Sequence, residues 1–269
     1  MTAKIGFIGT GKMASAIIKG IVSAGLYTTD EIIASNIHAD SRAKAEKELG
    51  IKVYSEPEEL SSRCELIVLA VKPQQIPSVF TSGSCGMGRN HTLVSIAAGI
   101  TIKSLKTYVP DSKVLRVMPN ICSTISAGAS AISASEDCDE NDLENVKKIF
   151  DSIGISFVIK EKDMDAVSAV SGSSPAFLFM IIEAMADGGV LMGLPRDMSI
   201  KLAAQTMYGA AKTVLETGTH PAILKDSVCS PGGTTIEGVK VLEDYGVRAA
   251  VISAIQASAE KSKELGKGN

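Results

Sequence analysis

Short apolar runs alternate with helical patterns through the first 160 residues, and this alternation limits the fold more than any other feature of the chain. The runs are KIGFIG, EIIAS, ELIVLAV, TLVSIAAG, KVLRVMP and GASAIS. The first four lack the alternating polar residues of a half-exposed strand, which is typical of a parallel sheet covered by helices on both faces. The pattern predicts an α/β fold, with an N-terminal doubly wound sheet of the Rossmann type.

The second half of the chain changes character. From Asp163 onward the β-branched runs disappear, and Ala, Met, Leu and Lys recur at helical spacing, as in MSIKLAAQTMYGAAKTVLE. We therefore predict a dinucleotide-binding domain over residues 1–162 and an all-helical domain over residues 163–269. The helical domain is rich in small apolar residues and poor in aromatics, so its apolar surface predicts dimerisation with a second copy.

Composition narrows the class of protein. The formal net charge is -3 and there is no basic tract, which argues against a nucleic-acid binder. The 5 cysteines are widely spaced and lack metal-ligand spacing, so we expect no metal, reduced thiols and a cytoplasmic protein. The most apolar segment, residues 176–194, contains Glu183 and Asp187 and falls short of the roughly 20 apolar residues that a bilayer needs. We expect a buried helix there and no membrane partner.

A glycine-spaced loop follows the first predicted strand. In KIGFIGTGKMA, Gly9, Gly11 and Ala14 precede an apolar-periodic helix. The first glycine permits a tight turn, the second lets a pyrophosphate approach the backbone, and the small Ala14 lets helix and strand pack closely. The helix N-terminus offers unpaired N–H groups to phosphate. The spacing predicts dinucleotide binding; the alternative is a plain tight turn.

The second predicted strand ends at Ser35 and Asn36, where an NAD-specific domain usually carries an acid. An acid would repel a 2′-phosphate, whereas Ser35 and Asn36 can donate hydrogen bonds to it, with Arg42 adding charge. This favours NADPH, with NADH as the second choice. The alternative is that Ser35 and Asn36 cap a helix starting near Asp40.

Two further segments follow predicted strands: AVKP, residues 70–73, and AAG, residues 97–99. Ligands of open α/β sheets bind at the carboxyl ends of the strands. Both segments are therefore candidates for contact with the cofactor, although Lys72 also fits a solvated surface charge.

A second glycine-rich turn, VCSPGGTTIEG, lies near the C-terminus. Thr234 and Glu237 fit a capping box at the start of a helix, and Gly232 and Gly233 carry no side chain that would block its N–H groups. Such a helix end can bind a carboxylate. The alternative is a capped helix without a ligand.

The segment SPGGTTIEGVKVLE resembles the signature of pyrroline-5-carboxylate reductases. GFIGTGKMASAIIKG, LAVKPQ, RVMPN, AVSGSSPAF and DGGVLMGLPR resemble the same family in the same order. The resemblance implies an NAD(P)H-dependent oxidoreductase that reduces 1-pyrroline-5-carboxylate to L-proline, the last step of proline biosynthesis. It also implies homodimers built on the helical domain and, in some members, decamers of five dimers.

The resemblance assigns roles to matching positions. The substrate carboxylate would be held by Ser230, Gly233 and Thr234, and the ring nitrogen by the hydroxyl of the catalytic Thr235. The residues implied for the cofactor are Gly9, Thr10, Gly11, Lys12, Met13, Ser35, Asn36, Ala70, Val71, Lys72, Pro73, Ala97, Ala98, Gly99 and Asn120. The chain departs from the family pattern at Ile121, Cys122 and Ser174.

Two rival interpretations remain at this point. A β-hydroxyacid dehydrogenase also joins a Rossmann domain to a helical one, but its resemblance would require a lysine in the helix AFLFMIIEAMADG, which has none. A non-catalytic NADP-binding protein would have no need of the second turn. His38, His91 and His220 lie in no motif and are expected to be structural.

Overall fold

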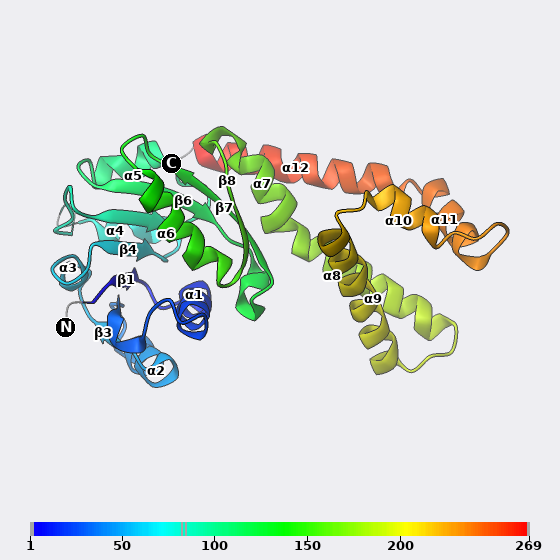
Figure 1. Ribbon diagram of the computed structural model, residues 1–269, viewed down its shortest axis with the longest axis horizontal. Helices are drawn as coiled ribbons and strands as arrows, with labels where there is room; N and C mark the ends of the chain where they lie inside the picture. Colours follow the sequence, from blue (N-terminus) through cyan, green and yellow to red (C-terminus); the bar gives the residue numbers. More distant parts are fainter. Residues whose placement is uncertain (1–2, 82, 84, 268–269) are drawn as a thin grey trace. The chain divides into compact units, whose positions relative to one another are not determined.

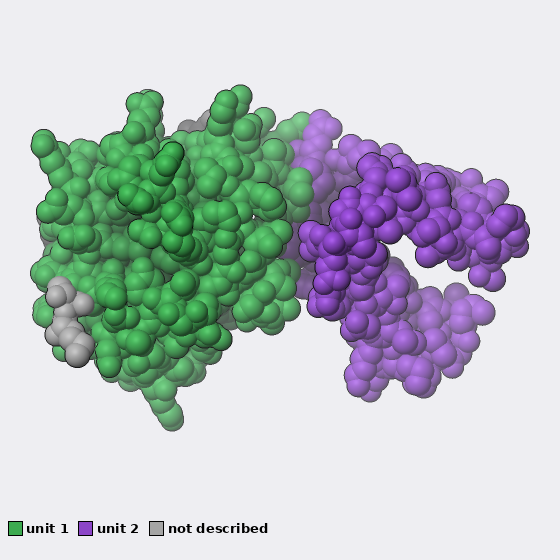
Figure 2. Space-filling view, viewed as in Figure 1, with its two compact units in different colours: residues 1–173, 258–269 green, residues 174–257 purple. Residues whose placement is uncertain are grey.

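The computed structural model describes residues 3–81, 83 and 85–267 (Figure 1). Contacts divide the chain into two compact units (Figure 2). Unit 1 comprises Met1–Ser173 and Ser258–Asn269, and unit 2 comprises Ser174–Ala257. The functional domain boundary between residues 162 and 163 stays a prediction.

Unit 1 is built on one sheet. Within the described residues, eight strands pair in the order β3-β2-β1-β4-β5-β6-β7-β8. All neighbours are parallel except β6 and β7, which are antiparallel. The strands are β1 (Ile5–Ile8), β2 (Ile32–Ser35), β3 (Lys52–Tyr54), β4 (Leu66–Leu69), β5 (Thr92–Ser95), β6 (Lys113–Met118), β7 (Gly128–Ala134) and β8 (Gly154–Val158).

Each of the six predicted apolar runs contains a strand, while β3 and β8 were not predicted. Both lie at the edges of the sheet. β3 is 3 residues long with one buried residue, Val53, and β8 leaves Ile155 and Phe157 exposed. Edge strands are half covered, so they lack the continuous apolar run that identifies the interior strands.

Helices cover both faces of the sheet, which confirms the doubly wound α/β fold. One buried cluster includes side chains of α1, α2 and α6, and the other includes side chains of α3, α4 and α5. These elements are α1 (Lys12–Ser23), α2 (Ala39–Leu49), α3 (Glu58–Ser61), α4 (Ile76–Val79), α5 (Ile102–Tyr108) and α6 (Glu140–Asp151). Short 3₁₀ turns are η1 (Thr29–Glu31), η2 (Pro73–Gln75), η3 (Ile121–Ile125) and η4 (Glu161–Asp163).

The chain is helical from Glu161 onward, as predicted. α7 (Met164–Val167) and the π-helical segment η5 (Ser168–Ser173) lead out of unit 1. Unit 2 contains α8 (Ser174–Leu191), α9 (Arg196–Thr217), α10 (Pro221–Ser227), α11 (Thr234–Asp244) and the first part of α12 (Val247–Lys267). From Ser258 onward, α12 belongs to unit 1.

The prediction that α8 is buried is wrong for the single chain. Its buried residues are Pro175 and Ala186, whereas Phe179 and Met180 are 59% and 68% exposed. By length and composition alone, the continuous helix from Glu161 to Leu191 contains an 18-residue window apolar enough to cross a membrane, with a mean hydropathy of 1.4 in that window. The expectation that this region falls short of such a span was therefore also wrong on that criterion. Too few elements of the chain pack around α8 to cover its apolar side chains.

Candidate functional site

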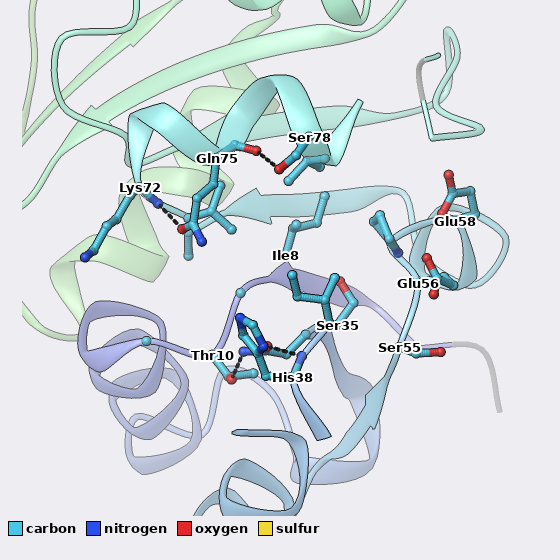
Figure 3. Close-up of a pocket in the computed structure, with 18 of the residues that line it drawn as sticks. Ile8, Thr10, Ser35, His38, Ser55, Glu56, Glu58, Lys72, Gln75 and Ser78 are labelled. Atoms are coloured by element: carbon cyan, nitrogen blue, oxygen red, sulfur yellow. Dashed lines mark hydrogen bonds between the residues drawn. The ribbon is translucent and has the colours of Figure 1, made fainter. Parts of the chain in front are cut away.

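A cavity of about 350 Å³ lies where β1, β2, β3 and β4 end. The sheet order reverses between β1 and β4, and open α/β sheets bind ligands at this switch point. The residues that line the cavity are Ile8, Gly9, Thr10, Gly11, Ser35, Asn36, Ile37, His38, Ser55, Glu56, Pro57, Glu58, Ala70, Val71, Lys72, Gln75, Ser78, Val79 and Thr81 (Figure 3).

The loop between β1 and α1 forms the floor of this cavity. Gly9 has φ +97°, and a Cβ there would lie 2.9 Å from the Ala70 carbonyl oxygen. Its N–H donates to the Ser35 carbonyl at 2.8 Å. Gly11 is the N-cap of α1 in extended conformation, and nothing lies within 4 Å of the position of its missing Cβ. The tight turn at Gly9 and the open approach at Gly11 agree with the geometry predicted for the two glycines.

The carboxyl end of β2 is held by the glycine loop. Asn36 Nδ2 donates to Thr10 Oγ1 at 2.8 Å, and Asn36 Oδ1 accepts from the His38 N–H at 3.0 Å. Arg42 Nη1 donates to the Asn36 and Ile37 carbonyls at 2.9 and 3.0 Å. The N-cap of α2 is His38, without a side-chain cap. The alternative that Ser35 or Asn36 caps α2 is therefore wrong.

Residues that follow β4 form another side of the cavity. Lys72 is exposed, and its backbone N–H donates to Gln75 Oε1 at 3.2 Å. Gln75 and Ser78 continue this side along the short helices η2 and α4 (Figure 3). Lys72 thus lines the cavity from its exposed rim.

Several predicted cofactor residues lie outside the lining of this cavity: Lys12, Met13, Pro73, Ala97, Ala98, Gly99 and Asn120. Lys12 and Met13 open α1, and Pro73 follows Lys72. The segment 97–99 follows β5 and Asn120 follows β6. β1, β4, β5 and β6 are parallel neighbours, so these loops lie along one edge of the sheet.

Other residues that line the cavity were not among the predicted cofactor residues. His38 lies at the start of α2, and Ser55, Glu56 and Glu58 follow β3 (Figure 3). The signal that could have found them is the run IKVY, because a strand there would place the next residues at the same sheet edge. Its short length and polar start concealed it.

The second turn, in unit 2, differs in detail from the prediction. α11 begins at Thr234, and its N-cap is Gly233, with φ -83° and ψ 172° and no side-chain cap. The predicted capping box is therefore wrong: Thr234 is the first helical residue, one position too late to cap. The N–H groups at this helix end donate no hydrogen bond to an N-cap side chain, which makes the end better suited to an anion than predicted.

Ser230 shapes the same turn. Its carbonyl accepts the Gly233 N–H at 3.0 Å, and a Cβ at Gly233 would collide with Ser230 Oγ. Gly232 has φ +66°. Ser230, Thr234 and Thr235 are exposed in the single chain. The structure brings the four predicted substrate residues together on one turn.

Two histidines have structural hydrogen bonds. His220 is the N-cap of α10, and its Nδ1 accepts from the Ala222 N–H at 3.2 Å. His91 Nδ1 accepts from the Gly88 N–H at 3.0 Å. Among the described residues, no group of three or more His, Cys, Asp or Glu side chains could hold a metal ion.

Two family models match the chain, one in each half. Residues 161–265 match the family model of pyrroline-5-carboxylate reductase dimerisation, and residues 4–99 match that of NADP oxidoreductase, coenzyme F420-dependent. A pyrroline-5-carboxylate reductase of Methanosarcina acetivorans is 43% identical over 265 residues, covering 98% of both chains. One of Escherichia coli is 42% identical over 268 residues, covering 99% of this chain and 100% of the relative.

Solved structures agree with these relatives. A pyrroline-5-carboxylate reductase of Coxiella burnetii has a TM-score of 0.91 at 31% identity, covering 98% of this chain and 99% of the other. A pyrroline carboxylate reductase of Plasmodium falciparum with NADP bound has a TM-score of 0.86 at 33% identity, covering 98% of both chains.

Proposed function

This chain belongs to the pyrroline-5-carboxylate reductase family, and on that premise we propose that it reduces 1-pyrroline-5-carboxylate to L-proline with NADPH. The observation that carries the proposal is the relationship over 98% of the chain. It covers both the glycine loop after β1 and the turn before α11. The reaction is the last step of proline biosynthesis.

The residues around the cavity fit a dinucleotide. A Cβ at Gly11 would meet nothing within 4 Å, so the backbone is open to a phosphate at the start of α1. The first turn of α1, Lys12–Ser15, contains no acid, and the α1 N-terminus favours negative charge. At the end of β2, Ser35 and Asn36 place no carboxylate beside the ribose, which favours NADPH over NADH.

The proposed cofactor contacts continue along the sheet edge. Ala70 to Pro73 and Ala97 to Gly99 follow β4 and β5, next to the glycine loop. The side-chain amide of Asn120 is already hydrogen-bonded within unit 1. NADPH, when bound, supplies the hydride.

The turn before α11 is the proposed seat of the substrate carboxylate. Ser230 and the backbone of Gly233 and Thr234 surround the α11 N-terminus, which has no side-chain cap. The Gly233 N–H already donates to the Ser230 carbonyl, so the Thr234 N–H is the backbone donor proposed for the carboxylate. The helix dipole contributes roughly 0.3 to 1 kcal/mol to binding an anion, and each charge-assisted hydrogen bond about 1.5 to 3 kcal/mol. We propose that the Thr235 hydroxyl, one residue further on, orients the ring nitrogen.

The protein's contribution to the reaction is mainly positioning. Holding the imine carbon against the hydride donor supplies much of the reduction in barrier. The Nδ1 atoms of His220 and His91 accept hydrogen bonds from backbone N–H groups, which gives each a structural role. The ring nitrogen must also gain a proton, which solvent supplies to the imine before hydride transfer, and the Thr235 hydroxyl keeps that nitrogen hydrogen-bonded and oriented.

Self-association follows from the helical half of the chain. Residues 161–265 match a dimerisation family, and α8 exposes Phe179 and Met180 in the single chain. We propose that a second copy, and not a membrane, covers this apolar face in a cytoplasmic homodimer. We also propose that five such dimers assemble into a decamer.

The test is a reduction assay with purified protein. NADPH and 1-pyrroline-5-carboxylate are mixed, nicotinamide absorbance is followed, and proline is identified as the product; NADH is run in parallel. Thr235→Ala should lower kcat/KM by about 10², and the control Thr107→Ala, an exposed residue on α5, should not. If NADPH binds but is not oxidised, the substrate assignment is wrong. Full kcat/KM in Thr235→Ala would remove that residue from the mechanism.

A further inference from the structure

Asn120 follows β6, and its side chain is buried, with the residue 8% exposed. A buried amide requires partners for both its donor and its acceptor. Asn120 Nδ2 donates to the Ser171 carbonyl oxygen at 3.0 Å, and Asn120 Oδ1 accepts from the Ala129 N–H at 3.3 Å. Both ends of the amide are therefore engaged within unit 1.

The Ser171 carbonyl has a specific reason to need this donor. Ser171 lies in the π-helical segment η5, which leads into α8. In the α-helical pattern its carbonyl would accept the N–H of residue 175, but residue 175 is proline and has no N–H. Asn120 supplies the Ser171 carbonyl with a donor where the α-type bond to residue 175 cannot form.

A second contact joins the end of β6 to the same turn. A Cβ at Gly172 would lie 3.2 Å from Met118 Cε, so Met118 packs directly on the backbone of η5. π-helical segments occur frequently at functional sites. The end of β6 thus holds η5 by one apolar contact and one hydrogen bond.

This turn is where the chain passes from one unit to the other. Unit 2 begins at Ser174, and the chain returns to unit 1 at Ser258. Ser258 Oγ donates to Ser173 Oγ at 2.7 Å, so the outgoing and returning segments meet beside η5. Unit 2 carries the turn proposed to bind the substrate.

We propose that Asn120 is a positioning residue for the reductase reaction and that its side chain is not a cofactor ligand. By donating to the Ser171 carbonyl, the amide holds η5, the segment of unit 1 from which α8 continues. This hydrogen bond ties η5 to the end of β6, at the sheet edge that carries the proposed cofactor loops. This inference rests on the function proposed above.

The experiment is a double-mutant cycle between Asn120 and Pro175. Asn120→Ala removes the donor, and Pro175→Ala restores a backbone N–H that the Ser171 carbonyl can accept. Asn120→Asp keeps an acceptor for Ala129 but has no donor for Ser171, so it serves as a second variant of similar size. Asn145→Ala, at an exposed position on α6, is the matched control.

Three quantities are measured for each protein: the Kd for NADPH by fluorescence titration, kcat, and KM for 1-pyrroline-5-carboxylate. We expect Asn120→Ala and Asn120→Asp to lower kcat about tenfold while the Kd for NADPH stays within about twofold. Adding Pro175→Ala to either should recover most of the lost kcat, and Asn145→Ala should match the wild type. The rescue is the result that a cofactor contact would not give.

Three results would overturn the proposal. The first is an NADPH Kd weakened about tenfold or more with kcat retained, which would make Asn120 a cofactor ligand. The second is a loss of kcat that Pro175→Ala does not rescue, and the third is no loss at all.

Amide hydrogen exchange over residues 168–178 separates this proposal from the proposed function. Asn120→Ala should speed exchange there and Pro175→Ala should reverse the effect, whichever substrate the enzyme takes. If the wild type does not reduce 1-pyrroline-5-carboxylate, the proposed function fails, while the exchange cycle still decides whether Asn120 anchors η5. Unchanged exchange in Asn120→Ala would refute the anchoring.

Discussion

The same substitution should have different consequences at the two glycines that follow β1. Gly9 has φ +97°, and a Cβ there would lie 2.9 Å from the Ala70 carbonyl oxygen and 3.0 Å from Val71 Cγ1. Gly11 has φ -73° and nothing within 4 Å of its Cβ position. We expect Gly9→Ala to damage folding and Gly11→Ala to damage cofactor binding alone.

The magnitudes follow from these contacts. A non-glycine residue in a left-handed conformation costs roughly 1–2 kcal/mol, and forcing a methyl into packed backbone adds about 1–3 kcal/mol. At about 2–4 °C per kcal/mol for a chain of this size, Gly9→Ala should lower Tm by about 4–20 °C. Gly11→Ala should change the free energy of unfolding by no more than about 0.5 kcal/mol.

The cofactor responds differently. A methyl at Gly11 would occupy the space proposed for a phosphate and displace at least one charge-assisted hydrogen bond, which is worth about 1.5–3 kcal/mol. The Kd for NADPH should therefore rise about 10- to 150-fold. For Gly9→Ala we predict no specific change in the Kd for NADPH, because the substitution first disrupts the turn itself.

Thermal unfolding and NADPH titration of both variants provide the assay. Gly88→Ala is the control, since nothing lies within 4 Å of a Cβ there and Gly88 does not line the cavity. If Gly11→Ala lowers Tm as much as Gly9→Ala does, the open approach is wrong. If it binds NADPH within about threefold of the wild type, the phosphate does not lie against Gly11.

Three further predictions concern the charge at the end of β2 and the two buried thiols. Asn36→Asp keeps the acceptor for His38 but adds a negative charge beside the proposed 2′-phosphate. At about 1–3 kcal/mol of repulsion, the substitution should shift the ratio of kcat/KM for NADPH over NADH about 10- to 100-fold toward NADH. An unchanged ratio would refute the 2′-phosphate position. Burial raises the pKa of the Cys64 and Cys85 thiols to about 12 from an ordinary 9.0, so both should resist alkylation in the folded protein at about pH 8, which mass spectrometry checks against Cys122 and Cys229. Labelling of Cys64 without unfolding would contradict its burial. Because the folded-state pKa values of both thiols are raised, the folded protein binds more protons than the unfolded chain between pH 9 and 12. The free energy of unfolding should therefore fall across that window.

Local patterns in the sequence predicted the parts of the structure that depend on neighbouring residues. The interior strands are continuous apolar runs because helices cover both faces of the sheet. Gly9, Gly11 and Ala14 lie within six residues of one another, so the turn, the open N–H groups and the close packing at the buried Ala14 follow from spacing. The uncapped turn before α11 was located in the same way, although the helix begins at Thr234 and not after it.

The sequence by itself determined a doubly wound sheet, a helical second half and the two glycine-rich turns. The tertiary structure alone decided which distant residues meet. The edge strands β3 and β8 have too little buried surface to show a pattern, so Ser55 to Glu58 became part of the cavity only once β3 was paired. The exposure of α8 depends on what packs around it and not on its own periodicity. Asn120 and Ser171 lie 51 residues apart, and no local pattern predicts that one completes the hydrogen bonding of the other, because that contact exists only when β6 and η5 are brought together by the fold.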